Sequence, residues 1–281
     1  MMMKLPHVKN VFVEDGPWDS TLTLVVSTSL AFLLVFRLNR VAIRWWDTRL
    51  MCGTIVANCR ILAEAILVHS NHEPKYRDDA ISYTAGFLVA VKQHMRNEKE
   101  YDYDELAGFL NQSQVDAMAA SSHPCLHATS EIRYALKNIF MVKADTPAAI
   151  GMSYSSQMRM MEKNIADLVL NMGGLERVRS TPLPIAFISH LRILNIFYLF
   201  SLPFIYGHNW GWSTIPVVIL TAYALLGIDG SASECESPFS KRPNHLDLEG
   251  FCLTAMNNIE ELVINNASKQ ANGNEHDNDA P

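Results

Sequence analysis

An uncharged, apolar stretch covers residues 20–36 and is rich in Leu, Val and Phe. It is slightly shorter than the roughly 20 apolar residues that cross a bilayer as a helix. The residues that follow, up to Arg49, are basic and include Trp45 and Trp46. If these tryptophans lie at the level of the lipid headgroups, the helix can be longer than its apolar part. Residues 20–49 are therefore predicted to form one membrane helix with its basic end towards the cytosol.

Aromatic and basic side chains recur along this helix at helical spacing. Thr28, Phe32 and Phe36 are four residues apart and share one face. Three arginines continue the helix close to that face: Arg37, Arg40 and Arg44. An apolar tube that opens onto positive charge suits an anion pathway. Taken alone, however, the stretch fits a simple membrane anchor better, with basic residues marking its cytosolic end.

The polar middle of the chain, residues 50–182, has apolar positions at helical spacing and no series of strands. Residues 50–70 continue the first helix, and a break containing Pro74 separates them from a helix over 80–96. A short helix is expected within 102–120, and another begins at Thr129 or Ser130. The last one covers 149–171 and is predicted to end at Gly173 and Gly174. The sequence predicts an all-α cytosolic region.

A second membrane region is predicted over residues 183–230. Two apolar spans, 185–206 and 213–228, flank a turn at 207–209 and form a helical hairpin that Asp229 and Gly230 end. His190 and Arg192 are costly in lipid, so they lie at the interface or face protein. A loop and a last helix then occupy 231–266, and the polar tail 267–281 is predicted to be disordered.

Composition and motifs exclude several other classes. The net charge of −6 argues against nucleic-acid binding. The five cysteines are scattered without a CxxC pair, so neither a disulfide scaffold nor a zinc site is indicated. His123, Cys125 and His127 alternate, but a plain loop explains them better than a metal site. No phosphate-binding loop, nucleophile elbow or HExxH motif is present, and no enzyme is predicted.

Three motifs together resemble the bestrophin family in its microbial, fungal and plant-type branch. The first motif is FRLN at 36–39 followed by RWWDTR at 44–49. The second is LERV at 175–178, TPLPIAF at 181–187 and HLR at 190–192. The third is GID at 227–229 with Glu234, Glu236 and PF at 238–239. Their order and number make the resemblance specific.

The resemblance implies an integral membrane anion channel for chloride or bicarbonate, built as a homopentamer around one axial pore. The hydrophobic neck of such a pore falls on Thr28, Phe32 and Phe36, and Arg37, Arg40 and Arg44 would attract anions. Counting back from the second motif puts a cytosolic constriction at Ile165. The host membrane stays open between the plasma membrane and a plastid thylakoid membrane.

The sequence departs from the family in two ways. Only residues 1–19 precede the neck helix, so the family's first membrane helix is expected to be missing, and a non-conducting scaffold or truncated channel subunit is the alternative function. Animal bestrophins also bind calcium after the PF motif. Here Lys241 and Arg242 intrude, and only Asp247 and Glu249 remain as weak candidates, so no cofactor is expected.

Overall fold

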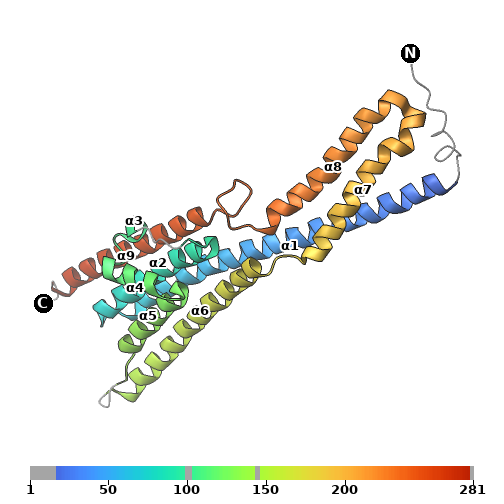
Figure 1. Cartoon of the computed structure of the whole chain (residues 1–281). Helices are drawn as coiled ribbons and strands as arrows, with labels where there is room; N and C mark the ends of the chain where they lie inside the picture. Colours follow the sequence, from blue (N-terminus) through green and yellow to red (C-terminus); the bar gives the residue numbers. More distant parts are fainter. Residues whose placement is uncertain (1–16, 99–102, 143–145, 279–281) are drawn as a thin grey trace. The chain divides into compact units, whose positions relative to one another are not determined.

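The computed structural model describes residues 17–98, 103–142 and 146–278. Within these ranges every regular element is a helix, which confirms the predicted all-α class (Figure 1). The α-helices are α1 (Pro17–His69), α2 (Pro74–Arg96), α3 (Tyr103–Leu106), α4 (Gln112–Ala120), α5 (Pro124–Ile139), α6 (Ala148–Ser180), α7 (Ile185–Trp210), α8 (Thr214–Glu236) and α9 (Leu248–Asn278). A short 3₁₀ helix, η1 (Gly211–Ser213), joins α7 to α8.

The chain divides into two compact units, and the boundary between them falls within α1. The first unit contains α1 up to Trp45 together with residues 182–236. In it α7 and α8 pack side by side as the predicted hairpin (Figure 1). Leu30 and Leu34 of α1 meet Leu191 of α7 in a core that excludes water almost completely. Burial of these leucines holds one face of α1 against the unit, at roughly 1.5–3 kcal/mol per side chain.

The second unit contains residues 46–181 and 237–281, and α2 lies at its centre. Every residue from Tyr83 to Gln93 is buried, so this part of α2 is covered around its whole circumference. Helices α5, α6 and α9 pack against it. Because a helix of this kind has no exposed face, even a charged side chain, Lys92, is carried into the interior.

The buried ammonium of Lys92 is neutralised by two carboxylates. Its Nζ donates to both Glu105 oxygens at 2.6 and 2.7 Å and to Glu249 Oε1 at 3.0 Å. Burial lowers the pKa of Lys92, but these hydrogen bonds outweigh it and leave the pKa above its usual value. A buried charge without such partners would cost several kcal/mol. Lys92 thus links α9 to α2.

Several predicted helix ends differ from the structure, mainly where Pro or Gly was taken as a break. Pro74, predicted to lie in a break, opens α2, and α5 begins at Pro124, before the predicted start at Thr129 or Ser130. Proline suits both starts, since the first turn of a helix needs no N–H from it. The predicted stop at Gly173 and Gly174 is wrong, because α6 continues to Ser180. Tertiary packing outweighs the roughly 1 kcal/mol by which each glycine disfavours a helix.

The hairpin and the last helix are also longer than predicted. Helix α7 passes the expected turn at 207–209, and the chain reverses instead at η1, where Gly211 has a φ of 51°. Helix α8 continues through Asp229 to Glu236. Helix α9 reaches Asn278, so most of the tail predicted to be disordered is helical. The predicted N-terminal segment, residues 1–19, lies almost wholly outside the described residues.

Candidate functional site

One face of α1 in the first unit is exposed and carries the predicted neck residues. Thr28, Phe32, Phe36 and Arg40 follow one another at intervals of four residues, and all four are exposed. Phe32 is 63% and Phe36 48% exposed, and their rings meet edge to face with centroids 4.5 Å apart. Aromatic edges carry partial positive charge, so such a pair can face an anion.

Polar side chains on this face distinguish it from a face that meets lipid. Ser29 and Asn39 are exposed beside the phenylalanines, as Arg40 is. Polar groups within a membrane are costly against hydrocarbon and normally face protein or a water-filled passage. The exposed face therefore suits a surface that is completed by another subunit or by water.

The opposite face of α1 is buried, and Arg37 lies on it. Arg37 is 1% exposed and forms an ion pair with Asp229 of α8. Its Nη2 donates to Ser233 Oγ at 3.0 Å and lies 3.8 Å from Glu236 Oε2. Arg192 of α7 also reaches Asp229, with its Nε 3.2 Å from Oδ2. Arg37 thus holds α1 to the hairpin inside the unit, an arrangement that helical spacing alone did not reveal.

The three arginines predicted to attract anions therefore lie in three different environments. Arg37 is buried and ion-paired, and Arg44 is half-buried with Glu236 near enough to interact with it electrostatically. Arg40 is exposed on the same face as Phe32 and Phe36. Arg40 is consequently the arginine that best fits the predicted role.

Ile165, the residue predicted to form a cytosolic constriction, lies inside the second unit. It is fully buried on α6, on the same side as Leu168 and Met172. A side chain that lines an axial passage must be exposed in the single chain, so this position does not agree with the predicted role. Leu170 is the large apolar side chain on the exposed side of this part of α6, with an exposure of 67%.

The two weak calcium candidates already have partners within the protein. Asp247 Oδ1 accepts the backbone N–H of Gly250 at 2.9 Å, in the first turn of α9. Glu249 accepts from Lys92 and from Arg96, each at 3.0 Å. The hydrogen bond from Lys92 is the largest cause that keeps the pKa of Glu249 below its usual value. Both carboxylates thus accept from protein donors, whereas calcium is held by several oxygen ligands.

His123, Cys125 and His127 do not form the predicted loop. His123 is the N-cap of α5, and Cys125 and His127 are in its first turn. Cys125 is completely buried, and His127 lies against the ring of Tyr83. The three side chains do not converge, but His123 meets two residues far away in the sequence, His94 and Glu176.

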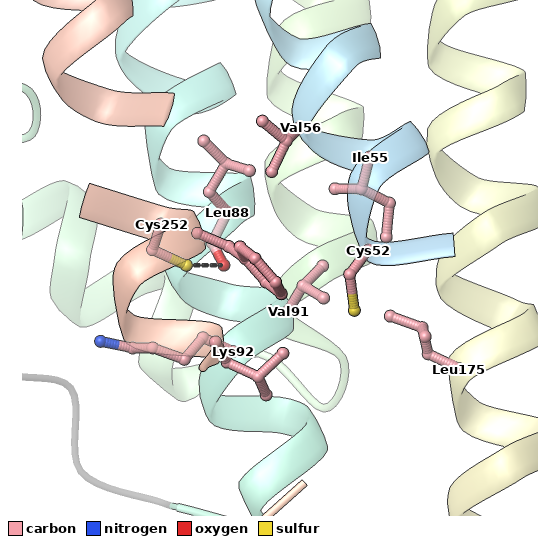
Figure 2. A pocket seen from close by; sticks show the side chains of 10 residues that line it. Cys52, Ile55, Val56, Leu88, Val91, Lys92, Leu175 and Cys252 are labelled. Carbon is pink, nitrogen blue, oxygen red and sulfur yellow. Dashed lines mark hydrogen bonds between the residues drawn. The ribbon is translucent and has the colours of Figure 1, made fainter. Parts of the chain in front are cut away.

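A small apolar cavity lies between α1, α2, α6 and α9 in the second unit (Figure 2). Its volume of about 30 Å³ is that of a single water molecule, too small for an organic ligand. The thiol of Cys252 donates to the Leu88 carbonyl at its edge, at 3.3 Å. Burial raises the pKa of Cys252 to about 12, so this thiol stays protonated and unreactive.

Comparison with known proteins places the fold and its motifs in one family. Residues 8–261 match the family described as "Bacterial/Fungal Bestrophin protein". The chain belongs to this bestrophin family. A relative from Nostoc sp. PCC 7120, named a voltage-dependent anion channel-forming protein, is 32% identical over 86% of this chain and 76% of its own length. A relative from Synechocystis sp. PCC 6803, also named a voltage-dependent anion channel-forming protein, is 30% identical over 86% of this chain and 76% of its own length.

A solved structure has the same fold as this bestrophin. The crystal structure of a bacterial bestrophin homolog from Klebsiella pneumoniae matches with a TM-score of 0.76. The match covers 86% of this chain and 87% of that chain at 22% identity.

This bestrophin is an integral membrane protein. Two helical segments, Thr21–His69 and Ile185–Glu236, are long and apolar enough to cross a bilayer. In the most apolar 18-residue stretch of each segment, only 17% and 6% of the residues are buried within the protein, so these two stretches are not the core of a soluble domain.

We expect Asp229→Asn to destabilise this bestrophin strongly, because Arg37 would stay buried with only the more distant Glu236 as a charged partner. Removing one partner of a buried ion pair costs roughly 3–5 kcal/mol. Asp78→Asn is the matched control, since Asp78 pairs with Arg77 at the surface, where such pairs contribute about 0–1 kcal/mol. Thermal unfolding of the purified protein in detergent measures both.

Replacing both Arg37 and Asp229 tests whether the loss of stability comes from the unpaired buried charge. Arg37→Met combined with Asp229→Asn removes the unpaired charge and should recover most of the lost stability. A double variant as unstable as Asp229→Asn alone would contradict the role of Arg37 as a buried charge that needs neutralising.

Proposed function

We propose that this bestrophin is an anion channel that conducts chloride or other small anions through a passage lined by α1. The observation that carries the proposal is the exposed face of α1, where Thr28, Phe32, Phe36 and Arg40 lie in one row. The names of the Nostoc and Synechocystis relatives, which call them anion channel-forming proteins, support the same function.

The row of side chains has the chemistry that selective anion passage needs. Phe32 and Phe36 form an apolar constriction whose aromatic edges tolerate an anion and whose bulk permits gating by dewetting. Arg40 follows one turn later and raises the local concentration of anions. Arg37 contributes to the pore indirectly, because its ion pair with Asp229 turns the phenylalanines outward.

The proposed channel is a closed ring of identical subunits in which α1, α7 and α8 cross the membrane. Arg40 and His190 are exposed in the single chain, and a ring removes such groups from lipid by enclosing them. Five copies follow from the resemblance to bestrophins.

The subunit number can be measured directly. Native mass spectrometry of the protein in detergent is expected to give the mass of five chains. A monomer as the main species, under conditions that preserve a reference membrane oligomer, would contradict the ring.

The neck is tested by replacing both phenylalanines. Phe32→Ala with Phe36→Ala should widen and wet the constriction, so single-channel current or open probability in planar bilayers should rise while the oligomer stays intact. Phe200→Ala with Phe204→Ala is the matched control. These two rings are also four residues apart and 67% exposed, but they lie on α7, where no arginine follows one turn later.

Other outcomes would contradict the proposed role of α1 in lining the pore. If Phe32 and Phe36 pack against neighbouring subunits without lining a pore, the double variant would lose roughly 3–5 kcal/mol per site and fail to assemble. An intact oligomer with unchanged current would mean that the constriction lies elsewhere. Wild-type protein that assembles and conducts nothing would favour a membrane scaffold.

Charge selectivity is tested at Arg40. Reversal potentials in a salt gradient should follow chloride, and a shift towards potassium would contradict the proposal. Arg40→Gln should lower the chloride current roughly two- to tenfold at low salt and less at high salt, where screening weakens the arginine. Lys75→Gln, which removes an exposed charge at the start of α2, should leave the current unchanged.

A further inference from the structure

Two histidines and a glutamate from three helices meet in the second unit. His94 is near the C-terminus of α2, His123 caps α5, and Glu176 is in the last part of α6. The Nε2 atoms of His94 and His123 lie 2.7 and 2.9 Å from the same atom, Glu176 Oε1. The two imidazole rings lie 4.8 Å apart between centroids. The three potential donor atoms all lie within 4.8 Å of one another.

This set of donors is chemically suited to a transition metal ion. Imidazole nitrogen and carboxylate oxygen bind Zn²⁺ at about 2.0–2.2 Å, which places neighbouring donors of a tetrahedral site about 3.3 Å apart. The two N–O separations, 2.7 and 2.9 Å, are shorter than this by about 0.5 Å, so a small rotation of each side chain would open the cluster around an ion. A water molecule would complete the tetrahedron.

The charge of Glu176 also suits a cation. Burial raises the pKa of this carboxyl group, but the hydrogen bonds from His94 and His123 outweigh it and leave the pKa below its usual value. The Oε1 atom that accepts from both imidazoles can serve as an anionic ligand, since carboxylate oxygen is a common ligand of Zn²⁺.

The surrounding contacts fix the end of α2 that carries His94 and oppose metal binding at His123 only weakly. Arg179 donates through Nη1 to the backbone carbonyl of His94 and through Nη2 to Asn97 Oδ1 at 2.8 Å, which fixes the end of α2. The Nδ1 atom of His123 accepts the Leu126 N–H at 3.4 Å. Metal binding through Nε2 would place the proton on Nδ1 and break this contact. At 3.4 Å the contact is long for a hydrogen bond, so its loss costs little.

The cluster is also open to ions from solution. The side chains of His94, His123 and Glu176 are 26%, 27% and 34% exposed, so a hydrated ion can reach them without unfolding. They are nevertheless covered enough to be held by the three helices. We propose that His94, His123 and Glu176 form a binding site for a divalent transition metal ion, with Zn²⁺ as the ion that best suits two imidazoles and one carboxylate. The bound ion would join α2, α5 and α6.

The proposal is tested with Zn²⁺ itself on the purified full-length protein, after treatment with a chelator. Calorimetric titration should show one Zn²⁺ per chain, and Zn²⁺ should raise the unfolding temperature because it binds the folded state. Mg²⁺ should do neither, since it prefers oxygen ligands. Loss of a supporting residue weakens metal sites about 10–100-fold, so loss of a ligand should weaken Zn²⁺ binding by about 100-fold or more.

The ligand variants are His94→Gln, His123→Gln and Glu176→Gln, each checked for native assembly before titration. Glutamine keeps a side chain able to hydrogen-bond within the cluster, so a folded variant that loses Zn²⁺ reports on the lost ligand. His127→Gln is the matched control, because His127 is on the same helix but lies against Tyr83. It should bind Zn²⁺ as the wild type does.

Three results would overturn the proposal: wild-type protein that takes up no Zn²⁺, equal weakening in His127→Gln and His123→Gln, or full binding in folded Glu176→Gln. The first would mean that the cluster only joins three helices through hydrogen bonds. Because none of these measurements uses ion current, their outcome is independent of whether the protein conducts anions.

Discussion

The ion pair between Arg37 and Asp229 determines which face of α1 is exposed. Arg37 is almost completely buried, and a buried guanidinium must be neutralised, so α1 can take only a rotation that brings this residue to α8. Leu30 and Leu34 then meet α7. Since helical geometry fixes every other side chain once one is placed, Phe32, Phe36 and Arg40 must lie on the outer side.

This dependence explains why the sequence predicted the helices well and the environment of the arginines poorly. Apolar periodicity predicted a helix from residue 20 to 70, and it is one helix in the structure. Arg37 and Arg40 are three residues apart, less than one helical turn, so their spacing alone does not show which of them is buried. What separates them is Asp229, which lies far along the chain and which no local pattern relates to α1. A predicted stop at Asp229 and Gly230 concealed this relation further.

The same limit applies to positions obtained by counting from a motif. Ile165 was located from the second motif, but one or two residues on a helix turn a side chain from the interior to the surface. Only the packing of α6 against its neighbours shows that Ile165 is inside and Leu170 outside. The cluster of His94, His123 and Glu176 was equally hidden, because its members belong to three separate helices. The helix starts at Pro74 and Pro124 could have been predicted from the tolerance of proline in a first turn.

The free cysteines give the molecule a practical property. Cys52, Cys59, Cys125 and Cys252 are all buried, and Cys235 is the only partly exposed thiol in the chain. A water-soluble thiol reagent would therefore find almost nothing to modify in the folded protein, and Cys235→Ser would remove even that site. A single cysteine introduced on the outer face of α1 could therefore be labelled with a reporter group almost selectively. The four buried cysteines of the core would not have to be replaced first.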